Sequence, residues 1–301
     1  MIPEKIQIVE VGPRDGLQNE KEWVPTETKI SLIEKLADAG LTKIEATSFV
    51  SPKWVPQLKD AHEVFTCIKR ISGVSYPVLT PNMKGFERAL EADAKEIAVF
   101  SAASEAFSQK NTNCSIEESI NRFRPVLDEA KKTNIPVRGY ISCVLGCPYQ
   151  GNVAVEDVVY LAAKMTEMGC FQISLGDTIG AGTHVQAKRM VQKVSEKVSV
   201  SKLALHFHDT RGQALANIYA CLELGVTVID ASVAGLGGCP YAKGATGNVA
   251  TEDVVFMLHG MDIETGIDLN KLIGTGRFIS GALGRLPQSR VSVAARNKHI
   301  H

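Results

Sequence analysis

The 301-residue sequence lacks any apolar run long enough to cross a membrane. Its apolar runs, such as residues 98–103, are far shorter than the roughly 20 residues that a spanning helix requires. It also lacks an excess of charge of either sign, because 33 Lys and Arg residues balance 33 Asp and Glu residues. A neutral chain of this kind does not favour binding to a nucleic-acid backbone or an anionic membrane surface. We therefore expect no nucleic acid and no membrane among its partners.

Cysteine is sparse, and the N-terminus shows no targeting pattern. The seven cysteines are an odd number spread over a long chain, so they do not indicate a disulfide framework. The first residues, MIPEKIQIVEVG, enter a strand pattern at once, without the basic and apolar segments of a secretory signal. The sequence also shows no transit peptide and no C-terminal peroxisomal tripeptide. We therefore expect a reducing, cytoplasmic location.

Short β-branched or apolar runs alternate with amphipathic stretches along the sequence. Most of these runs are too apolar for a sheet with one solvated face, as expected when helices cover a parallel sheet. Eight such units without a break in composition predict an α/β fold, a single (β/α)8 TIM barrel. The strands are predicted at 6–11, 43–49, 75–80, 96–102, 137–144, 171–177, 203–208 and 228–234. We expect one catalytic domain over 1–301, with the barrel at about 5–260 and a C-terminal helical extension at about 265–301.

Helix signals support this arrangement. Apolar residues every three or four positions predict a helix over residues 116–130, opened by a capping box of Ser115 and Glu118. The same spacing predicts one additional helix after the eighth unit, over 269–283, and the basic tail beyond it is expected to fray.

One motif occurs twice, as CPYQGNVAVEDVV from Cys147 and as CPYAKGATGNVATEDVV from Cys239. Both copies predict a helix start, with Asn or Thr as N-cap and an acidic pair in the first turn. The acidic pairs, Glu156 with Asp157 and Glu252 with Asp253, are therefore interpreted as structural. The copies follow strands five and eight, so they do not mark a half-barrel duplication.

Two histidines lie at the end of the seventh strand, in HFHDTRG. His206 and His208 are two residues apart, so their side chains point to the same face of a strand. At the C-terminal rim of a barrel, where reactive groups gather, this pair indicates a metal platform. Asp209 should point away from it and is interpreted as a turn residue or a support for the ligands.

Barrel closure places strands seven, eight and one side by side. Asp15, after strand one, and Asn248, after strand eight, can therefore converge on His206 and His208. Two imidazoles, a carboxylate and an amide oxygen suit Mg²⁺ or Mn²⁺, whereas Zn²⁺ is disfavoured because the set has no thiolate. Asn152 follows strand five and lies too far round the barrel to join them.

Other polar residues end the predicted strands on the same rim. Arg14 is interpreted as a fixed donor to a developing oxyanion, against the alternative of a rim salt bridge with Asp177 or Glu45. Ser48, near Glu45, is a candidate substrate contact together with Arg14. Cys239 lies in a glycine-rich loop that could close over the site, whereas Cys147 is expected to be a buried, unreactive thiol.

The motifs VGPRDGLQNE, IEATSFVSPKWVPQ, SLGDTIG, HFHDT and GLGGCPYAKGATGNVATED occur in this order. Together they resemble the 3-hydroxy-3-methylglutaryl-CoA lyase family, within a wider group of metal-dependent barrels that includes isopropylmalate and homocitrate synthases. The resemblance covers nearly the whole chain. It implies an acyl-CoA thioester substrate, a divalent metal, a homodimer and a retro-Claisen cleavage that gives acetyl-CoA and acetoacetate.

The resemblance also implies roles for individual residues. Metal binding is implied for Asp15, His206, His208 and Asn248, and catalysis for Arg14, Glu45, Asp177 and Cys239. Asp177 or Glu45 would remove the hydroxyl proton, Arg14 would stabilise the departing enolate, and Cys239 would protonate it. No phosphate-binding fingerprint identifies the residues that contact CoA.

Three alternatives stay open from the sequence. The first is a Claisen-condensing synthase on the same barrel, although EVGPRDGLQ differs from the Asp-Thr-Thr-Leu-Arg-Asp-Gly type of motif of those enzymes. The second is a lyase for a related 3-hydroxy acyl-CoA. The third is a metal-binding scaffold without catalysis, which would not need Arg14, Glu45, Asp177 and Cys239.

Overall fold

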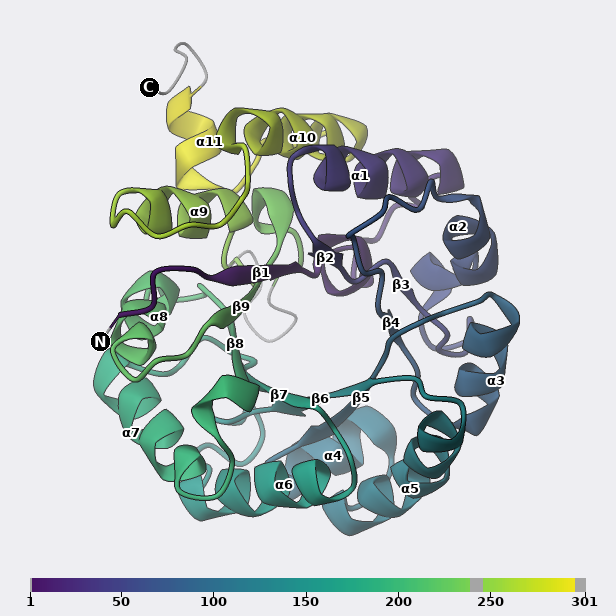
Figure 1. The fold of residues 1–301 in the computed structure, drawn as a ribbon, viewed down its shortest axis with the longest axis vertical. Coiled ribbons are helices and arrows are strands. Elements are labelled where there is room, and N and C mark those ends of the chain that lie inside the picture. The colour runs from purple at the N-terminus through teal and green to yellow at the C-terminus, as the bar shows by residue number, and fades with distance from the viewer. Residues whose placement is uncertain (1, 239–245, 296–301) are drawn as a thin grey trace.

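A parallel barrel forms the centre of the molecule, and helices surround it (Figure 1). The computed structural model describes residues 2–238 and 246–295. The barrel strands are β1 (Gln7–Glu10), β2 (Lys43–Ile44), β3 (Thr47–Ser48), β4 (Val78–Leu79), β5 (Ile97–Ala102), β6 (Val137–Ser142), β7 (Gln172–Asp177), β8 (Leu203–Phe207) and β9 (Val228–Ala231). The predicted (β/α)8 TIM barrel is confirmed.

The second barrel position holds two short strands instead of one. β2 pairs with β1, and β3 pairs with β4. Between them, the Glu45 N–H donates to the Glu10 carbonyl at 2.8 Å and the Ala46 N–H to the Pro77 carbonyl at 3.0 Å. The chain therefore changes partners at Glu45, which closes the barrel and leaves the predicted strand at 43–49 interrupted.

Apart from β2, which leads directly into β3, the strands are followed by helices that pack their apolar faces on the barrel. The helices are α1 (Thr26–Asp38), α2 (Ala61–Cys67), α3 (Met83–Glu91), α4 (Glu105–Thr112), α5 (Ile116–Lys132), α6 (Val155–Glu167), α7 (His184–Ser195), α8 (Ala214–Leu222), α9 (Thr251–His259), α10 (Leu269–Ala282) and α11 (Arg290–Ala294). The capping box predicted for α5 is present, with both Ser115 and Glu118 bonded to backbone N–H groups. The short helices α4 and α11 were not predicted.

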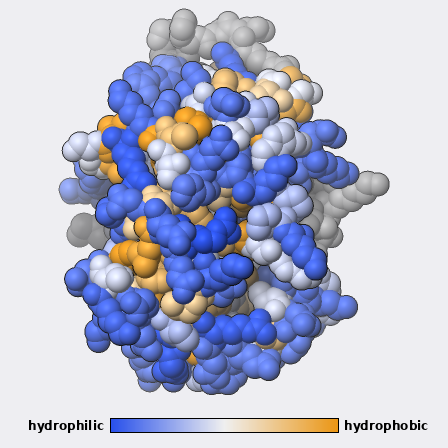
Figure 2. All heavy atoms as spheres, turned by 90° about the vertical axis from the view of Figure 1, so that its right-hand side faces the viewer, coloured by the Kyte–Doolittle hydropathy of each residue, from blue (hydrophilic) through white to orange (hydrophobic). Residues whose placement is uncertain are grey.

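The molecular surface is mostly hydrophilic, because the helices turn their apolar faces towards the barrel. Hydrophilic residues cover most of the face shown in Figure 2, and apolar residues occur there in smaller groups. In the described part of the chain, no helix is both long and apolar enough to span a membrane.

The two copies of the repeated motif begin helices differently from the prediction. The N-cap residues are Ala154 for α6 and Ala250 for α9, and neither makes a side-chain capping bond. The predicted Asn or Thr caps are therefore wrong, because the last Ala of each Gly-Asn-Val-Ala segment is still extended and the helix begins directly after it, at Val155 and at Thr251. The acidic pairs do lie in the first turns of both helices.

Among the described residues, only the second acidic pair makes long-range hydrogen bonds. Both Glu252 oxygens accept from the Ala234 N–H at 2.9 and 3.0 Å, and Ser292 Oγ donates to the same carboxylate at 3.0 Å. Asp253 accepts from Ser289 Oγ at 2.7 Å and from the N–H groups that begin α11. The pair therefore fixes the C-terminal extension against the loop after β9.

Candidate active site and metal centre

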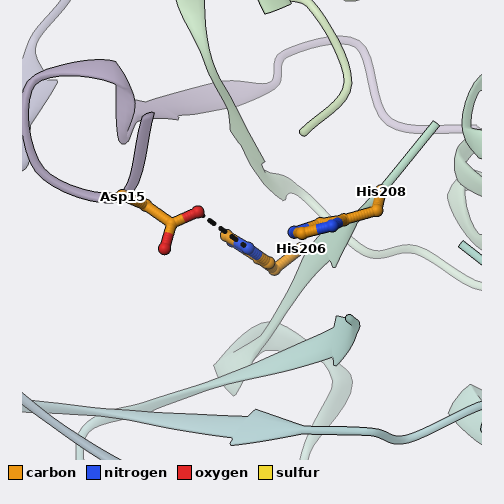
Figure 3. Close-up of side chains that lie close together, drawn as sticks. All are labelled: Asp15, His206 and His208. Carbon is orange, nitrogen blue, oxygen red and sulfur yellow. Dashed lines mark ion pairs between the residues drawn. The ribbon is translucent and has the colours of Figure 1, made fainter. Parts of the chain in front are cut away.

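Three potential metal ligands come together at the C-terminal end of the barrel (Figure 3). One ligand atom from each of Asp15, His206 and His208 lies within 4.8 Å of the others. The two imidazole centroids are 5.5 Å apart, which confirms that His206 in β8 and His208 directly after it point to the same side. Nε2 of His206 lies 3.8 Å from Oδ2 of Asp15. Residues distant in sequence thus form one cluster because β1 and β8 flank β9.

Asp15 reaches this cluster from a tight turn, η1 (Gly12–Gly16). The turn packs directly on the segment that follows β9. A Cβ on Gly16 would lie 2.7 Å from Cβ of Leu236 and 2.8 Å from Oγ of Ser232, so only glycine fits this approach. Glu10 ties the same two segments together, since its carboxylate accepts from the Gly12 N–H at 2.8 Å and the Val233 N–H at 2.9 Å.

The protonation of the cluster suits a cation. Burial would raise the pKa of Asp15, but the charges of Arg14 and the two histidines outweigh it and lower that pKa to about 2. Burial, with His206 beside it, lowers the pKa of His208 to about 4. At neutral pH the site therefore offers an ionised carboxylate and a neutral imidazole with a lone pair.

One buried atom in the cluster has no partner. Nδ1 of His208 makes no hydrogen bond within the described residues. Leaving a buried polar atom unpaired costs about 1–3 kcal/mol, and a bound ion or its water would remove that cost. The donors are imidazole nitrogen and carboxylate oxygen, which are common ligands of divalent cations. The residues present therefore fit a divalent metal.

Asn248 lies at the same place, as its sequence position predicts. It bridges to His208 in the sheet, and its Nδ2 donates to Oδ2 of Asp15 at 2.7 Å and to the Leu236 carbonyl at 3.2 Å. No described residue donates a hydrogen bond to its Oδ1. Its role as a metal ligand stays a prediction.

Arg14 joins the metal cluster to Glu45. Its Nη1 donates to Oδ1 of Asp15 at 2.8 Å, and its Nε donates to Oε2 of Glu45 at 2.7 Å. Glu45 is fully buried, and its Oε1 has no partner within the described residues. Burial raises the pKa of Glu45 although Arg14 opposes this. Arg14 therefore holds the Glu45 carboxylate in place while one of its oxygens stays available to a ligand.

A buried ion pair behind His206 was missed from the sequence. Asp230 of β9 receives two bonds from Arg138 of β6, at 2.6 and 3.0 Å, and one from Ser174 Oγ at 2.7 Å. Nδ1 of His206 lies 3.3 Å from the same carboxylate. The available signal was a charged residue inside each of two otherwise apolar strands, but their pairing requires the barrel register.

The structure does not bring Asp177 to the metal cluster. Asp177 is in register with Phe207, whereas Gly176 is in register with His206, so its side chain lies on the other face of the sheet. Its two oxygens accept from the Ala181 and Gly182 N–H groups at 3.0 and 2.9 Å. The carboxylate therefore anchors the loop after β7, and its catalytic role is an untested prediction.

The remaining predicted residues have local partners. Ser48 is buried and bonds to the Leu79 carbonyl at 3.3 Å and the Val50 N–H at 3.2 Å. Asp209 accepts from the Ala214 N–H at 2.9 Å, as a turn residue would. Cys147 is buried and accepts from Ser104 Oγ at 2.9 Å. Cys239 lies outside the described residues.

Comparison with known proteins identifies the family. The family model described as HMGL-like matches residues 5–279. The chain belongs to the HMGL-like family. This family membership accounts for the barrel and for the ordered motifs, and it confirms the resemblance seen in the sequence.

Relatives in this family are carbon–carbon lyases. The chain is 60% identical to mitochondrial hydroxymethylglutaryl-CoA lyase of Gallus gallus, over 97% of this chain and 98% of that protein. It is 58% identical to cytoplasmic 3-hydroxy-3-methylglutaryl-CoA lyase of Danio rerio, over 98% of this chain and 88% of that one.

Solved structures agree with these relatives. Hydroxymethylglutaryl-CoA lyase from Pseudomonas aeruginosa shares 56% identity and superimposes with a TM-score of 0.96, over 97% of this chain and 98% of that one. An HMG-CoA lyase from Acinetobacter baumannii, in complex with coenzyme A and 3-methylmalate, shares 40% identity with a TM-score of 0.93, over 99% and 97%.

Proposed function

We propose that the protein cleaves 3-hydroxy-3-methylglutaryl-CoA to acetyl-CoA and acetoacetate in a retro-Claisen reaction that depends on Mg²⁺ or Mn²⁺. One observation carries the proposal: Arg14 bonds at once to Asp15 of the metal cluster and to Glu45. A proton acceptor, a fixed positive charge and a metal site are thereby held side by side. The named activity of relatives that are 56–60% identical supports the same substrate.

Asp15, His206, His208 and Asn248 would hold the ion. Bound there, Mg²⁺ or Mn²⁺ supplies positive charge beside the substrate oxygens and favours ionisation of the tertiary hydroxyl. The chain's part is to present the neutral imidazole of His208 and the ionised carboxylate of Asp15 in a site whose four residues are largely buried.

Glu45 is the acceptor for the hydroxyl proton in this proposal. Its Oε1 is buried and has no partner in the described part of the chain, and its raised pKa brings it closer to working pH. Asp177, the other candidate, already uses both oxygens on backbone N–H groups. The geometry therefore favours Glu45 over Asp177 as the base.

Arg14 would stabilise the negative charge that develops on the enolate as the C–C bond breaks. Its Nε and Nη1 are occupied, but no described residue accepts from its Nη2. A preorganised donor in a water-poor site can contribute several kcal/mol to enolate stabilisation. The enolate carbon must then gain a proton, and Cys239 is the group proposed to deliver it.

The test is a product assay. The protein is incubated with 3-hydroxy-3-methylglutaryl-CoA and Mg²⁺ or Mn²⁺, and acetoacetate and acetyl-CoA are measured. We expect equal amounts of both products, none of either with EDTA, and strongly reduced amounts with Cys239→Ala. Absence of products from the wild-type protein with metal would exclude the proposed reaction.

We further propose a homodimer of single-domain chains in a reducing compartment, with the cytoplasm as the first choice. Every described cysteine is a free thiol, which supports the compartment. Light scattering would test the assembly, with an expected mass of twice the chain's 32.5 kDa.

A further inference from the structure

We infer that Asp230, held by Arg138 and Ser174, is a positioning residue that sets the tautomer and orientation of His206 for metal binding. The inference rests on the proposed metal-dependent function, but it concerns residues that no sequence motif assigned.

The two ring nitrogens of His206 face different carboxylates. Nδ1 lies 3.3 Å from Oδ2 of Asp230, whereas Nε2 lies 3.8 Å from Oδ2 of Asp15. An acceptor at Nδ1 favours the tautomer that carries its proton there. Nε2 then presents its lone pair to the centre of the cluster, which is the form a metal requires.

Asp230 itself cannot move. Arg138 donates to both of its oxygens, and Ser174 Oγ donates to the oxygen that faces His206. Arg138 is fixed in turn by Gln172 Oε1 at 2.7 Å and Tyr140 Oη at 2.8 Å. The side chains of Arg138 and Asp230 are at most 1% exposed.

Stability alone does not explain this ion pair. A buried pair loses so much hydration energy that apolar residues are often as stabilising. The pair lies beneath the metal cluster, and its carboxylate retains an acceptor site directed at a ligand. His208 has no such partner, because its Nδ1 is unpaired within the described residues. His206 is therefore the ligand whose orientation is preset.

The test compares three variants by Mn²⁺ titration, followed by electron paramagnetic resonance of the free ion. Asp230→Asn removes the negative acceptor and should weaken Mn²⁺ binding about 10–100-fold, the usual effect of removing such a support. Ser174→Ala keeps the ion pair and removes one bond to Asp230, so a smaller loss is expected. Should Asp230→Asn fail to fold, Ser174→Ala decides the question.

Glu96→Gln is the matched control. Glu96 also forms a largely buried ion pair, with Lys43 at 2.8 and 2.9 Å, at the opposite end of the barrel strands. This variant should lose stability yet bind Mn²⁺ like the wild type. Wild-type affinity in Asp230→Asn, or an equal loss of affinity in Glu96→Gln, would overturn the inference.

A second readout needs no metal. Long-range ¹H–¹⁵N spectra of the imidazole rings in metal-free protein should show His206 protonated at Nδ1, and a changed tautomer ratio in Asp230→Asn. An Nε2-protonated His206 in the wild type would refute the positioning role. Failure of the wild type to bind Mn²⁺ would instead count against the proposed metal-dependent function and leave this spectrum to decide the role of Asp230.

Discussion

Tyr140 lies between the two buried arginines of the site. The guanidinium carbon of Arg14 is 5.3 Å from its ring centroid and that of Arg138 is 4.9 Å away, while His206 contacts the ring edge-on at 5.9 Å. Two positive charges so close together must each have a carboxylate, and Glu45 and Asp230 supply these. The site is therefore a set of coupled ion pairs in which each residue has a distinct task.

Glu45→Gln separates proton transfer from metal binding. Gln keeps the size of the side chain and a hydrogen-bond acceptor for Arg14, but it cannot take the hydroxyl proton. We expect kcat to fall about 10²–10⁴-fold, the usual worth of a general base. Mn²⁺ affinity should change little, because Glu45 does not contact the metal cluster directly. Turnover close to that of the wild type would rule out Glu45 as the base.

Cys147→Ala tests the unequal roles of the two motif copies. Cys147 packs with Ala102, Phe107 and Cys143 and accepts a bond from Ser104. Its loss should lower the free energy of unfolding by about 1 kcal/mol, the net worth of a hydrogen bond. Turnover should stay within about twofold of the wild type in a steady-state assay, whereas Cys239→Ala should nearly abolish it. A large loss of kcat in well-folded Cys147→Ala would contradict this asymmetry.

At this scale, the sequence predicted the residues that end strands better than those inside them. Asp15, His206, His208 and Asn248 stand at strand ends, where a barrel always gathers reactive groups. Asp230 and Arg138 lie within strands and are 92 positions apart. Their meeting depends on which residues face the lumen, and apolar periodicity does not specify that in a fully buried strand.

At the scale of elements, α9 is held by long-range contacts that its sequence does not reveal, although α6 begins with a similar sequence. Glu252 reaches across to Ala234 and Ser292, and Gly276 of α10 permits this, since a Cβ there would lie 2.4 Å from Oε1 of Glu252. The corresponding acidic pair in α6, Glu156 and Asp157, is exposed to solvent. Identical local sequences can therefore have different partners, because the barrel decides what lies opposite each copy.

Glu252→Gln should change how stability depends on pH. Burial raises the pKa of Glu252 from 4.5 to about 8, so the folded protein keeps this proton over a range where the unfolded chain has lost it. Folding then takes up a proton, and raising the pH from about 5 to 8 lowers the stability that Glu252 contributes. Gln does not titrate.

Chemical denaturation of metal-free protein at several pH values would measure this effect. The free energy of unfolding of the wild type, minus that of Glu252→Gln, should decrease steadily from pH 5 to pH 8. Other titrating groups, including Glu10, are present in both proteins and cancel in the difference. A difference that is constant or rises with pH would show that Glu252 is ionised in the folded state.

The types and order of the main elements were predictable because each βα unit carries its own local signal. The interruption at Glu45 was not, since it arises from the demand that one strand pair with β1 and then with β4 to close the barrel. Helices α4 and α11 are too short for a periodic pattern. Element boundaries therefore depended on tertiary contacts more than element types did.

At the scale of the whole molecule, the metal cluster is a product of barrel closure. Asp15 follows the first strand, and the histidines lie about 190 positions later, at the end of β8. Only a closed barrel brings these ends together, with β9 between them. An ion that binds both ends should therefore stabilise the folded chain as a whole and should have little affinity for the unfolded one.

Mn²⁺ should raise the Tm of the metal-free protein, and EDTA should reverse the change. A ligand that binds only the folded state adds about 2.7 kcal/mol at 100 times its Kd, which corresponds to about 4 °C for a chain of this size. Asp15→Asn removes the ligand from the first strand and should abolish most of the shift. Asp209→Asn is the matched control, since it removes the same charge next to His208 but from a side chain bonded to the start of α8. Its baseline Tm should fall while the Mn²⁺ shift stays. An undiminished shift in Asp15→Asn would place the ion elsewhere, because binding would then not depend on a ligand from the segment after β1.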